Sequence, residues 1–547
     1  MGYLEDPTKL IVFLAPLFIA ALVLVKVLSP DSQRAAPNVP IIGLRIQLFP
    51  WIRAALRSLP LTREWAFDGY SIHSKSNSFF VLPTIDRGSI WIAPPKQMKK
   101  LYGLADRVLD THETTKETLQ MPWTIGDRQI YDYDFHMNLV KNQLTRNLDI
   151  LTPAITAEIQ DGFGREWDVS NEEWTEIDVW RSTIRIIGSA ANSAFFGPPI
   201  CHDREFIWRL QDHASSLFLA SMLINCTPWP FRYVVGTVMS GLCHYRFRRI
   251  SALCIDLVKE RLDNTAKLRS DVSFLWIAPK DGLQWLIEEC YARNDPQQLK
   301  PERVLHRLVF LNDISLHSTS YTAQNVILDL ASADADVIDA LRKESAQVLA
   351  QAGGVWSRQA VQDLKLIDST IRESMRLNPF NSIGLPRTVM HPEGIVVEQD
   401  GKPITIPAKT KIMIPVEPIQ HDESVYSDAT SFKPFRFAKP MSGTGGGAGS
   451  PLLATKDSEY YPQQQGNRKS SATIDDAFLG FGFGIHACPG RFFALNELKI
   501  FVATMVLNYD LQPLPERPKA KPVGWLNVPF FTDFRVGVKK RAADDLR

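Results

Sequence analysis

Near the N-terminus, Leu10–Val25 form an uninterrupted apolar run that ends at Lys26. A membrane-spanning helix needs about 17–25 residues, so the run is long enough only if the lysine extends its ammonium group to the bilayer surface. Glu5 and Asp6 precede the run and basic residues follow it, a bias that places the rest of the chain in the cytosol. The pattern predicts a single membrane anchor over residues 1–29. A secretory signal peptide is the alternative, but no cleavage site of small residues clearly follows the run.

Beyond the anchor, the hydrophobic pattern changes twice. Phe79–Leu82 and Ser89–Ala93 are short apolar runs bounded by proline and glycine, which is typical of strands. From about residue 96 to 377 the apolar residues recur with helical spacing, and residues 395–416 return to short apolar runs separated by turn residues. The pattern therefore predicts a mainly α domain over residues 61–547 that includes a small β-rich subdomain.

Two segments show neither the helical spacing nor the short apolar runs of strands. Residues 30–60 contain Pro30, Pro37 and Pro40, and we expect them to form a stiff linker. Residues 440–473 are rich in glycine, serine and glutamine, a composition that favours a flexible insertion over packed structure. No internal repeat is found.

Composition excludes several classes of function. The 61 lysines and arginines balance 60 aspartates and glutamates, so the chain has no excess of positive charge that would indicate binding to nucleic acid. Its six cysteines are scattered without C-x-x-C spacing, which favours neither a zinc site nor a disulfide framework. Free cysteines agree with a reducing compartment. The 45% of hydrophobic residues is enough for a large core.

One cysteine lies in a distinctive loop, Phe481–Arg491, with the sequence FGFGIHACPGR. Gly482 and Gly484 allow a tight turn and a close approach to a flat partner, where a Cβ would collide. Cys488 lies just before a predicted helix over Phe492–Leu507, so free N–H groups at the helix start can stabilise a negative charge on the sulfur. Such a loop suits a thiolate that binds iron.

The loop resembles the haem-binding signature of the cytochrome P-450 family, F-x-x-G-x-R-x-C-x-G. Phe481, Gly484, Cys488 and Gly490 match it, and His486 stands where most members have arginine, as in a variant associated with fungal members. The resemblance implies that the Cys488 thiolate is the axial ligand of the iron of haem b. It also implies that the other four residues surround the cofactor.

A second motif of the family combines Glu373 and Arg376 with Arg436. The first two are three residues apart on a predicted helix over Leu364–Leu377, so their side chains meet on one face. Arg436 lies downstream in the sequence PFRF. The resemblance implies a buried structural triad, in which two planar guanidinium groups share one carboxylate.

A third motif lies on a predicted helix over Val304–Leu330, which the resemblance places on the oxygen side of the haem. Here His317 replaces the family's acid and Ser318 its threonine, and Thr319 is the active hydroxyl if the alignment shifts by one. A hydroxyl at this place can bond a main-chain carbonyl, kink the helix and steady a water. An imidazole titrates near neutral pH and could pass protons.

Haem carboxylates need cationic partners, and the resemblance implies Arg387, His486 and one of three basic residues, His136, Lys141 and Arg146, of which we select Lys141. The family's substrate-recognition segments also correspond to apolar residues of this chain, as an apolar ligand requires. For each of these residues core packing is an equal alternative. They are Trp123, Phe310, Leu316, Ile383, Leu385 and Phe530.

The resemblance covers residues from about 65 to 540 and implies the cytochrome P-450 fold, with residues 61–547 as a haem-thiolate catalytic domain. It implies a monooxygenase that receives two electrons from NADPH through an NADPH–cytochrome P-450 reductase. One atom of O₂ would enter an apolar small molecule, such as a terpenoid, polyketide or alkaloid intermediate of fungal secondary metabolism. With its single anchor, the enzyme would lie in the endoplasmic reticulum membrane and face the cytosol.

Two alternatives remain open. A haem-thiolate isomerase, dehydratase or peroxide-using enzyme would need no reductase, and the replacements at His317 and Ser318 are compatible with it. A membrane-bound binding protein without catalysis is the second, but the intact Cys488, Glu373 and Arg376 argue against it.

Overall fold

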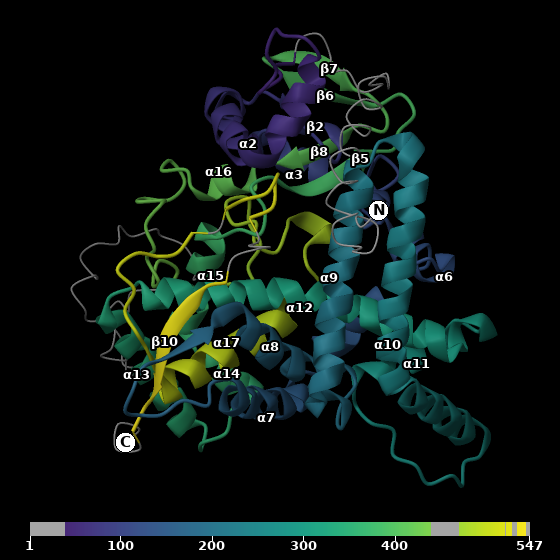
Figure 1. The fold of residues 1–547 in the computed structure, drawn as a ribbon, viewed down its shortest axis with the longest axis vertical. Coiled ribbons are helices and arrows are strands. Elements are labelled where there is room, and N and C mark those ends of the chain that lie inside the picture. Colours follow the sequence, from purple (N-terminus) through teal and green to yellow (C-terminus); the bar gives the residue numbers. More distant parts are fainter. Residues whose placement is uncertain (1–38, 439–469, 520, 528–532, 543–547) are drawn as a thin grey trace, which may run out of the picture.

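The computed structural model describes residues 39–438, 470–519, 521–527 and 533–542 (Figure 1). The predicted anchor, most of the predicted insertion and Phe530 lie outside this part of the chain. Within the described residues, no helix is both long and apolar enough to cross a membrane.

A five-stranded sheet and a hairpin form the β-rich part of the molecule. The strands of the sheet lie in the order β1 (Phe80–Thr84), β2 (Gly88–Ile92), β8 (Lys411–Ile414), β5 (Gly384–Val389) and β3 (Leu109–Asp110). The antiparallel hairpin consists of β6 (Ile395–Gln399) and β7 (Lys402–Ile406). All pairs in the sheet are antiparallel except β2 with β8. The strands predicted from short apolar runs are therefore confirmed, with ends shifted by one or two residues.

Helix α2 (Pro50–Ile72) packs against this sheet, and its first residues lie within the range that we predicted as a linker. We expected a linker over residues 30–60, but the helix begins inside that range. Proline is favoured in a first helical turn, whereas Pro60 inside the helix concealed its period. Contact with the sheet stabilises the helix, because a Cβ added at Gly69 would lie 2.3 Å from the Phe80 ring.

Helix α12 (Pro301–Ala331) runs through the middle of the helical body (Figure 1). Most of its residues are buried, as expected for a helix surrounded by others. Its neighbours include α8 (Val179–Phe195), α9 (Arg204–Cys226), α10 (Trp229–Ser270), α15 (Lys365–Leu377) and α17 (Arg491–Asn508). The predicted helices at the oxygen side, at the charged triad and after the cysteine loop are confirmed as α12, α15 and α17.

The other elements complete a mainly α architecture with a small β-rich subdomain, as predicted. Two short strands, β3 and β4 (Thr175–Asp178), interrupt the region that we expected to be helical, and β4 joins a sheet of order β4-β10-β9 with β9 (Tyr509–Leu511) and β10 (Arg535–Lys540). The remaining helices are α3 (Pro95–Tyr102), α4 (His112–Thr118), α5 (Met121–Thr124), α6 (Arg128–Tyr131), α7 (Leu148–Glu166), α11 (Gly282–Ala292), α13 (Ala335–Gln351), α14 (Arg358–Asp363) and α16 (Val416–Gln420).

We predicted a flexible insertion over residues 440–473, but its last residues, from Ser470 onward, pack against the rest of the protein. Ser471 is buried, and its main-chain N–H and Oγ donate to the Asp368 carboxylate over 3.1 and 2.5 Å. Arg372 of α15 donates to the Ser470 carbonyl over 2.7 Å. The insertion therefore ends before Ser470, because these contacts attach the chain to α15.

Candidate functional site: the cysteine loop and helix α12

Glycine and main-chain hydrogen bonds shape the loop that carries Cys488. Gly482 and Gly484 have φ angles of 80° and 71°, in the left-handed region that favours glycine. The main-chain N–H of Cys488 donates to the Phe481 carbonyl over 2.8 Å and closes the loop. Helix α17 begins directly after Gly490, so the sulfur lies beside a helix N-terminus, as the sequence predicted.

The Cys488 thiol differs from the core thiol of Cys254 in its electrostatic surroundings. Burial raises the pKa of the Cys488 thiol, while the main-chain N–H groups of Gly490 and Arg491 and the Arg491 charge oppose the rise. Burial also raises the pKa of Cys254, to about 12, without such donors. Donors at a helix start stabilise a thiolate, and a bound cation would complete that stabilisation.

Two of the loop glycines lie against neighbouring elements. A Cβ added at Gly482 would lie 3.4 Å from the side chain of Leu385, and one added at Gly484 would lie 3.4 Å from the carbonyl of Tyr102. The Tyr102 hydroxyl donates to the Leu385 carbonyl over 2.6 Å. Leu385 has a φ of 58°, a backbone conformation that costs a residue with a Cβ about 1–3 kcal/mol and is concentrated at functional sites.

Arg387 and His136 are buried, and each has a polar group whose bonding capacity is not fully used by the described residues. The Arg387 guanidinium lies over the Tyr102 ring and donates to the Pro386 carbonyl, and within the described residues it has no ion pair. Arg307 donates to Nδ1 of His136 over 2.9 Å, so Nε2 carries the proton of the neutral ring. That N–H has no partner in the described part of the chain.

The Arg387 cation and the free N–H of His136, together with the cysteine loop, fit haem. A buried guanidinium requires an anion, and the haem carboxylates would supply one to Arg387 and accept the N–H of His136. Burial and the nearby Arg307 charge lower the pKa of His136 to about 3, so its ring binds as a neutral donor. Cys488 would be the iron ligand.

A π-helix, η2 (Leu139–Leu144), packs against the far end of the loop. A Cβ added at Gly490 would lie 3.3 Å from Val140 on this helix, and π-helices are frequent at functional sites. Lys141, which we selected from the sequence as a haem partner, is exposed and borders a polar surface pocket. His136, another of the three candidates, has a buried position that suits this role better, and the choice of Lys141 stays a prediction. The wider π turn changes which side chains share a face, and the sequence does not reveal it.

The outer side of the loop faces solvent. Ile485 is 73% exposed, and His486 beside it places Nε2 2.6 Å from the Asp106 carboxylate. A pairing with a carboxylate competes with the haem contact expected for His486. Its role at the cofactor stays a prediction.

Glu373, Arg376 and Arg436 form a compact charged cluster. Each oxygen of Glu373 accepts a hydrogen bond of 2.8 Å from Arg376, and Nε of Arg436 lies 3.0 Å from both oxygens. The first two side chains are fully buried and the third nearly so. Arg376 also donates to the carbonyls of Gln420 and Ala429 over 2.6 Å. The structure thus brings together the three residues that the sequence grouped, and satisfies their buried charges.

Helix α12 is open along one narrow stripe. Ile314 is 38% exposed and Ser318, one turn later, is also exposed, although both lie in the middle of a buried helix. The Ser318 Oγ lies 3.3 and 3.2 Å from the carbonyls of Ile314 and Ser315, to which it donates. This carbonyl contact agrees with the prediction, but the predicted kink does not interrupt the helix. Thr319 is buried, so Ser318 is the hydroxyl on the open stripe.

His317 lies away from this stripe. Its ring stacks on Trp180 of α8 at 5.9 Å between centroids and also contacts Phe218 of α9. We expected an imidazole that titrates near neutral pH, but burial lowers the pKa of His317 to about 4. The ring is therefore neutral at physiological pH, and Nδ1 has no hydrogen-bond partner among the described residues.

The predicted substrate contacts divide into two groups. Leu385 lies against the cysteine loop, and Phe310 contacts His136 with 5.8 Å between ring centroids. Phe310 also belongs to an apolar cluster with Met121, Ile125, Ile130, Tyr131 and Leu217. These two residues keep a position suited to an apolar ligand.

Of the other described candidates, Leu316 and Ile383 are buried in the core and Trp123 is half-buried, and their role as substrate contacts stays a prediction. Leu316 faces Gly188 of α8, on the side of α12 opposite Ser318, because two residues turn a helix by about 200°. Ile383 is buried in the core between α2 and the sheet. Trp123 covers Gly236 of α10, where a Cβ would lie 2.6 Å from its ring.

A cavity of about 930 Å³ lies beside the C-terminal half of α12 and is lined by charged and polar side chains as well as apolar ones. Two ion pairs line it, Arg63 with Glu417 at 2.6 Å, and Asp329 with Arg517. An apolar substrate would leave these groups poorly solvated, so this cavity is not a suitable substrate site.

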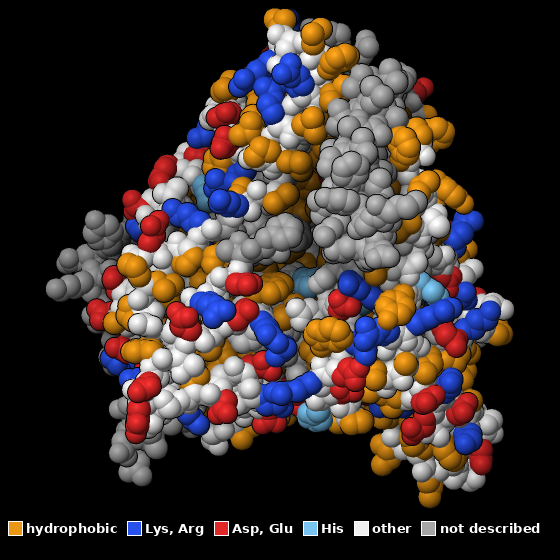
Figure 2. Space-filling view, in the orientation of Figure 1, with side chains coloured by type: hydrophobic (Ala, Val, Ile, Leu, Met, Phe, Trp, Pro, Cys, Tyr) orange, Lys and Arg blue, Asp and Glu red, His pale blue; other side chains and the backbone are white. Residues whose placement is uncertain are grey.

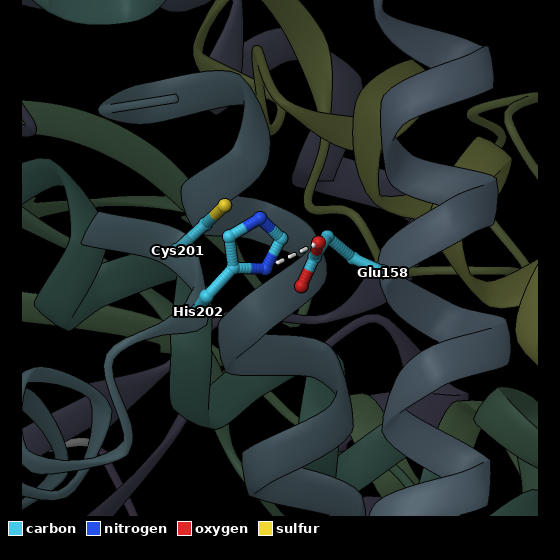
Figure 3. A group of neighbouring side chains, drawn as sticks. All are labelled: Glu158, Cys201 and His202. Atoms are coloured by element: carbon cyan, nitrogen blue, oxygen red, sulfur yellow. Dashed lines mark ion pairs between the residues drawn. The ribbon is translucent and has the colours of Figure 1, made fainter. Parts of the chain in front are cut away.

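Glu158, Cys201 and His202 form a cluster with ligand-type side chains that the sequence did not indicate (Figure 3). Nδ1 of His202 lies 2.9 Å from Glu158, and Arg165 lies 3.7 Å from the other carboxylate oxygen. Burial raises the pKa of Cys201 to about 12. The Arg165 cation and the His202 ring already contact the carboxylate and the thiol is protonated, so these contacts account for the cluster.

Comparison with known proteins identifies the family. The family model for cytochrome P-450 matches residues 134–529. The chain is 36% identical over 521 residues to the cytochrome P-450 monooxygenase okaG of Penicillium ochrochloron, covering 93% of this chain and 95% of that protein. It is 30% identical to gloP of Glarea lozoyensis, covering 88% and 87% of the two chains, and 31% identical to htyF of Aspergillus rugulosus, covering 91% and 72%. Both are also named cytochrome P-450 monooxygenases.

These matches extend over most of the chain and include the cysteine loop, the triad and the open stripe of α12. They agree with the mainly helical fold, and membership of this family implies haem held through a cysteine thiolate. The chain therefore belongs to the cytochrome P-450 family and is an oxidoreductase of the monooxygenase type.

Proposed function

We propose that this monooxygenase is anchored to the endoplasmic reticulum membrane and inserts one atom of O₂ into an apolar small molecule. The substrate class is a terpenoid, polyketide or alkaloid intermediate of fungal secondary metabolism, and the electrons come from NADPH through a cytochrome P-450 reductase. The observation that carries the proposal is the Cys488 thiol at the start of α17, a helix that packs against α12.

The chain's own residues would bind and orient the cofactor. Cys488 would ligate the iron, with the N–H groups of Gly490 and Arg491 stabilising the thiolate. Arg387 and His136 would bind the carboxylates. Haem, when bound, supplies the oxygen chemistry, and the protein supplies orientation and protons.

Ser318 would hold a water at the oxygen side. Its proton is engaged by the carbonyls of Ile314 and Ser315, so the lone pairs of Oγ are free to accept a hydrogen bond from water. A fixed water in this position can transfer a proton with the geometry that general acid catalysis requires. The removal of this hydroxyl should misdirect protons and leave substrate binding unchanged.

Apolar side chains support an apolar substrate. Phe310 and Ile314 lie one turn apart on α12, the first in an apolar cluster and the second on the open stripe. Burial of apolar ligand surface yields roughly 25 cal/mol per Å², so a polar ligand would be bound less well here. Comparison of metabolites extracted from the source organism before and after gene deletion would identify the substrate.

Membrane association is supported by an apolar surface at the start of α10. Trp229 is 81% exposed, and Tyr233, Val234 and Val238 follow it on the same helix with most of their surface exposed. Figure 2 shows orange side chains at this upper right end of the molecule. Tryptophan and tyrosine favour the interface between membrane and water, so this surface would rest on the bilayer that the N-terminal segment enters.

A reductase-independent isomerase or peroxide-using enzyme is the second candidate. The observation that favours it is that His317, which replaces the family's acid, is neutral and faces Trp180. Product formation by the purified protein separates the two. Dependence on both NADPH and reductase supports the monooxygenase, and equal turnover without them supports the alternative.

A further inference from the structure

Helix α12 carries a carboxylate inside the core. Asp313 is fully buried, and its Oδ2 lies 2.9 Å from Nδ1 of His213, a buried residue of α9. Burying two ionisable groups costs several kcal/mol, and an apolar pair of similar volume would be at least as stable. Stability therefore does not explain this pair.

Further imidazoles extend the pair along α12. His306 lies two turns before Asp313 and is half-buried, and its ring stacks on Phe247 of α10 with 4.1 Å between the ring centroids. Phe247 also contacts the His213 ring at 6.1 Å. On the surface of α10, His244 is exposed and close enough to His306 to influence its charge.

The row continues toward the open stripe of α12. His317 lies one turn after Asp313, so the two side chains share a face with about 5–6 Å between their Cβ atoms. Ser318 is the next residue and carries the hydroxyl on the stripe. Titratable side chains thus extend from the surface of α10 to the oxygen side.

Atoms along this row lack partners in the described part of the chain. They include Nε2 of His306, Nε2 of His213, Oδ1 of Asp313 and Nδ1 of His317, all buried. Buried polar atoms almost always bind protein groups or ordered water. Water in the intervals would satisfy these atoms and connect them.

We propose that His244, His306, His213, Asp313 and His317 form an internal proton path from the surface of α10 to Ser318. The inference rests on the proposed monooxygenase function. Each turnover combines substrate, O₂, two electrons from NADPH through the reductase and two protons, and yields hydroxylated substrate and one water. The path delivers the protons that the family's missing acid would otherwise supply.

The protonation states of His306 and His317 suit the transfer of a proton, because neither ring holds a charge at neutral pH. The pKa of His306 is lowered to about 3 and that of His317 to about 4, both mainly by burial, so each ring is neutral and can accept a proton on one nitrogen while it releases one from the other. Burial raises the pKa of Asp313, and the nearby His213 opposes this. The titratable and charged side chains that face His306 are His213, Asp127, His244 and Arg307.

Steady-state turnover tests the path. Asp313→Asn should lower kcat at least about tenfold, as expected for loss of a proton donor, with KM and the substrate-induced spectral shift unchanged. The solvent isotope effect on kcat should increase, and Asp313→Glu should restore most of the rate. Asn192→Ala is the matched control, because it removes a buried 2.6 Å hydrogen bond to Asn312, the neighbour of Asp313. It should leave kcat and the isotope effect unchanged.

Infrared spectroscopy follows the proton without turnover. In protein labelled with carbon-13 at the aspartate carboxyls, the acid band that disappears in Asp313→Asn should exchange rapidly in D₂O, although the group is fully buried. His306→Leu should slow that exchange at least about tenfold, since it interrupts the relay of neutral imidazoles. Equally fast exchange in His306→Leu would contradict the path.

The double variant Asp313→Leu/His213→Leu replaces the pair by apolar side chains and preserves the packing if single variants fail to fold. Unchanged kcat and isotope effect in this folded, haem-containing variant would overturn the proposal. If the wild-type protein forms no product with NADPH and reductase, the proposed function itself fails. The two failures are therefore distinguishable.

Discussion

The charged cluster under the cysteine loop provides a quantitative test of the structure. Glu373→Gln preserves the shape of the side chain but removes the only carboxylate that Arg376 and Arg436 share. Arg376 is fully buried, and the amide nitrogen that replaces one oxygen would face a guanidinium donor. Removing one partner from a buried ion pair costs about 3–5 kcal/mol. The free energy of unfolding should fall by that amount.

Urea unfolding of the haem-containing protein, followed by circular dichroism, measures this loss. The matched control is Asp256→Asn, which breaks a surface pair between Asp256, 91% exposed, and Lys259 and should not measurably change stability. A loss below about 1 kcal/mol for Glu373→Gln, with haem bound normally, would refute the argument, because burying an unpaired guanidinium should lower the free energy of unfolding by more than that.

Three further predictions concern the oxygen side and the membrane. Ser318→Ala should keep the substrate-induced spectral shift but release more hydrogen peroxide per NADPH consumed, while the buried Thr319→Ala should couple normally; equal peroxide release in both variants would remove Ser318 from its role. His317→Ala should change turnover by the same factor at pH 6 and pH 8, because the pKa of about 4 keeps the ring neutral at both; an effect that grows with pH would show that the ring titrates near neutrality. Deletion of residues 1–29 should release most of the protein from membranes with its haem spectrum intact, and secretion of a cleaved full-length chain would identify a signal peptide instead.

Local sequence rules predicted the elements well. The spacing of apolar residues predicted the bounds of α12, α15 and α17 to within a few residues, because each helix buries a continuous apolar face. The alternation of short apolar runs with proline and glycine gave the strands. Helix α2 was missed because Pro60 lies inside it and the neighbouring prolines resemble a linker.

The site was predictable where a motif fixes the local backbone. Gly482, Gly484 and Cys488 define the loop by themselves, and the three-residue spacing of Glu373 and Arg376 brings their side chains together. Exposure along α12 depends on neighbouring helices, so the sequence did not separate Ser318 from Thr319 or show that burial holds His317 neutral.

Other site residues depend on tertiary structure alone. His136 is buried and Lys141 is exposed, and the π-helix Leu139–Leu144, which contains Lys141, changes which side chains share a face. The sequence could have indicated Asp313 as a candidate, since it is a charged residue within an apolar helical pattern. Such a residue usually has a buried partner, and here that partner comes from α9, about one hundred residues earlier in the chain.

Ligation of iron by Cys488 is the central claim, and one spectrum tests it most directly. The reduced, carbon-monoxide-bound protein should show the red-shifted Soret band of a thiolate-ligated haem. Cys488→Ala should abolish that band, whereas Cys254→Ala and Cys290→Ala, which remove buried thiols of the core, should retain it. A normal thiolate spectrum from the Cys488→Ala protein would contradict the account.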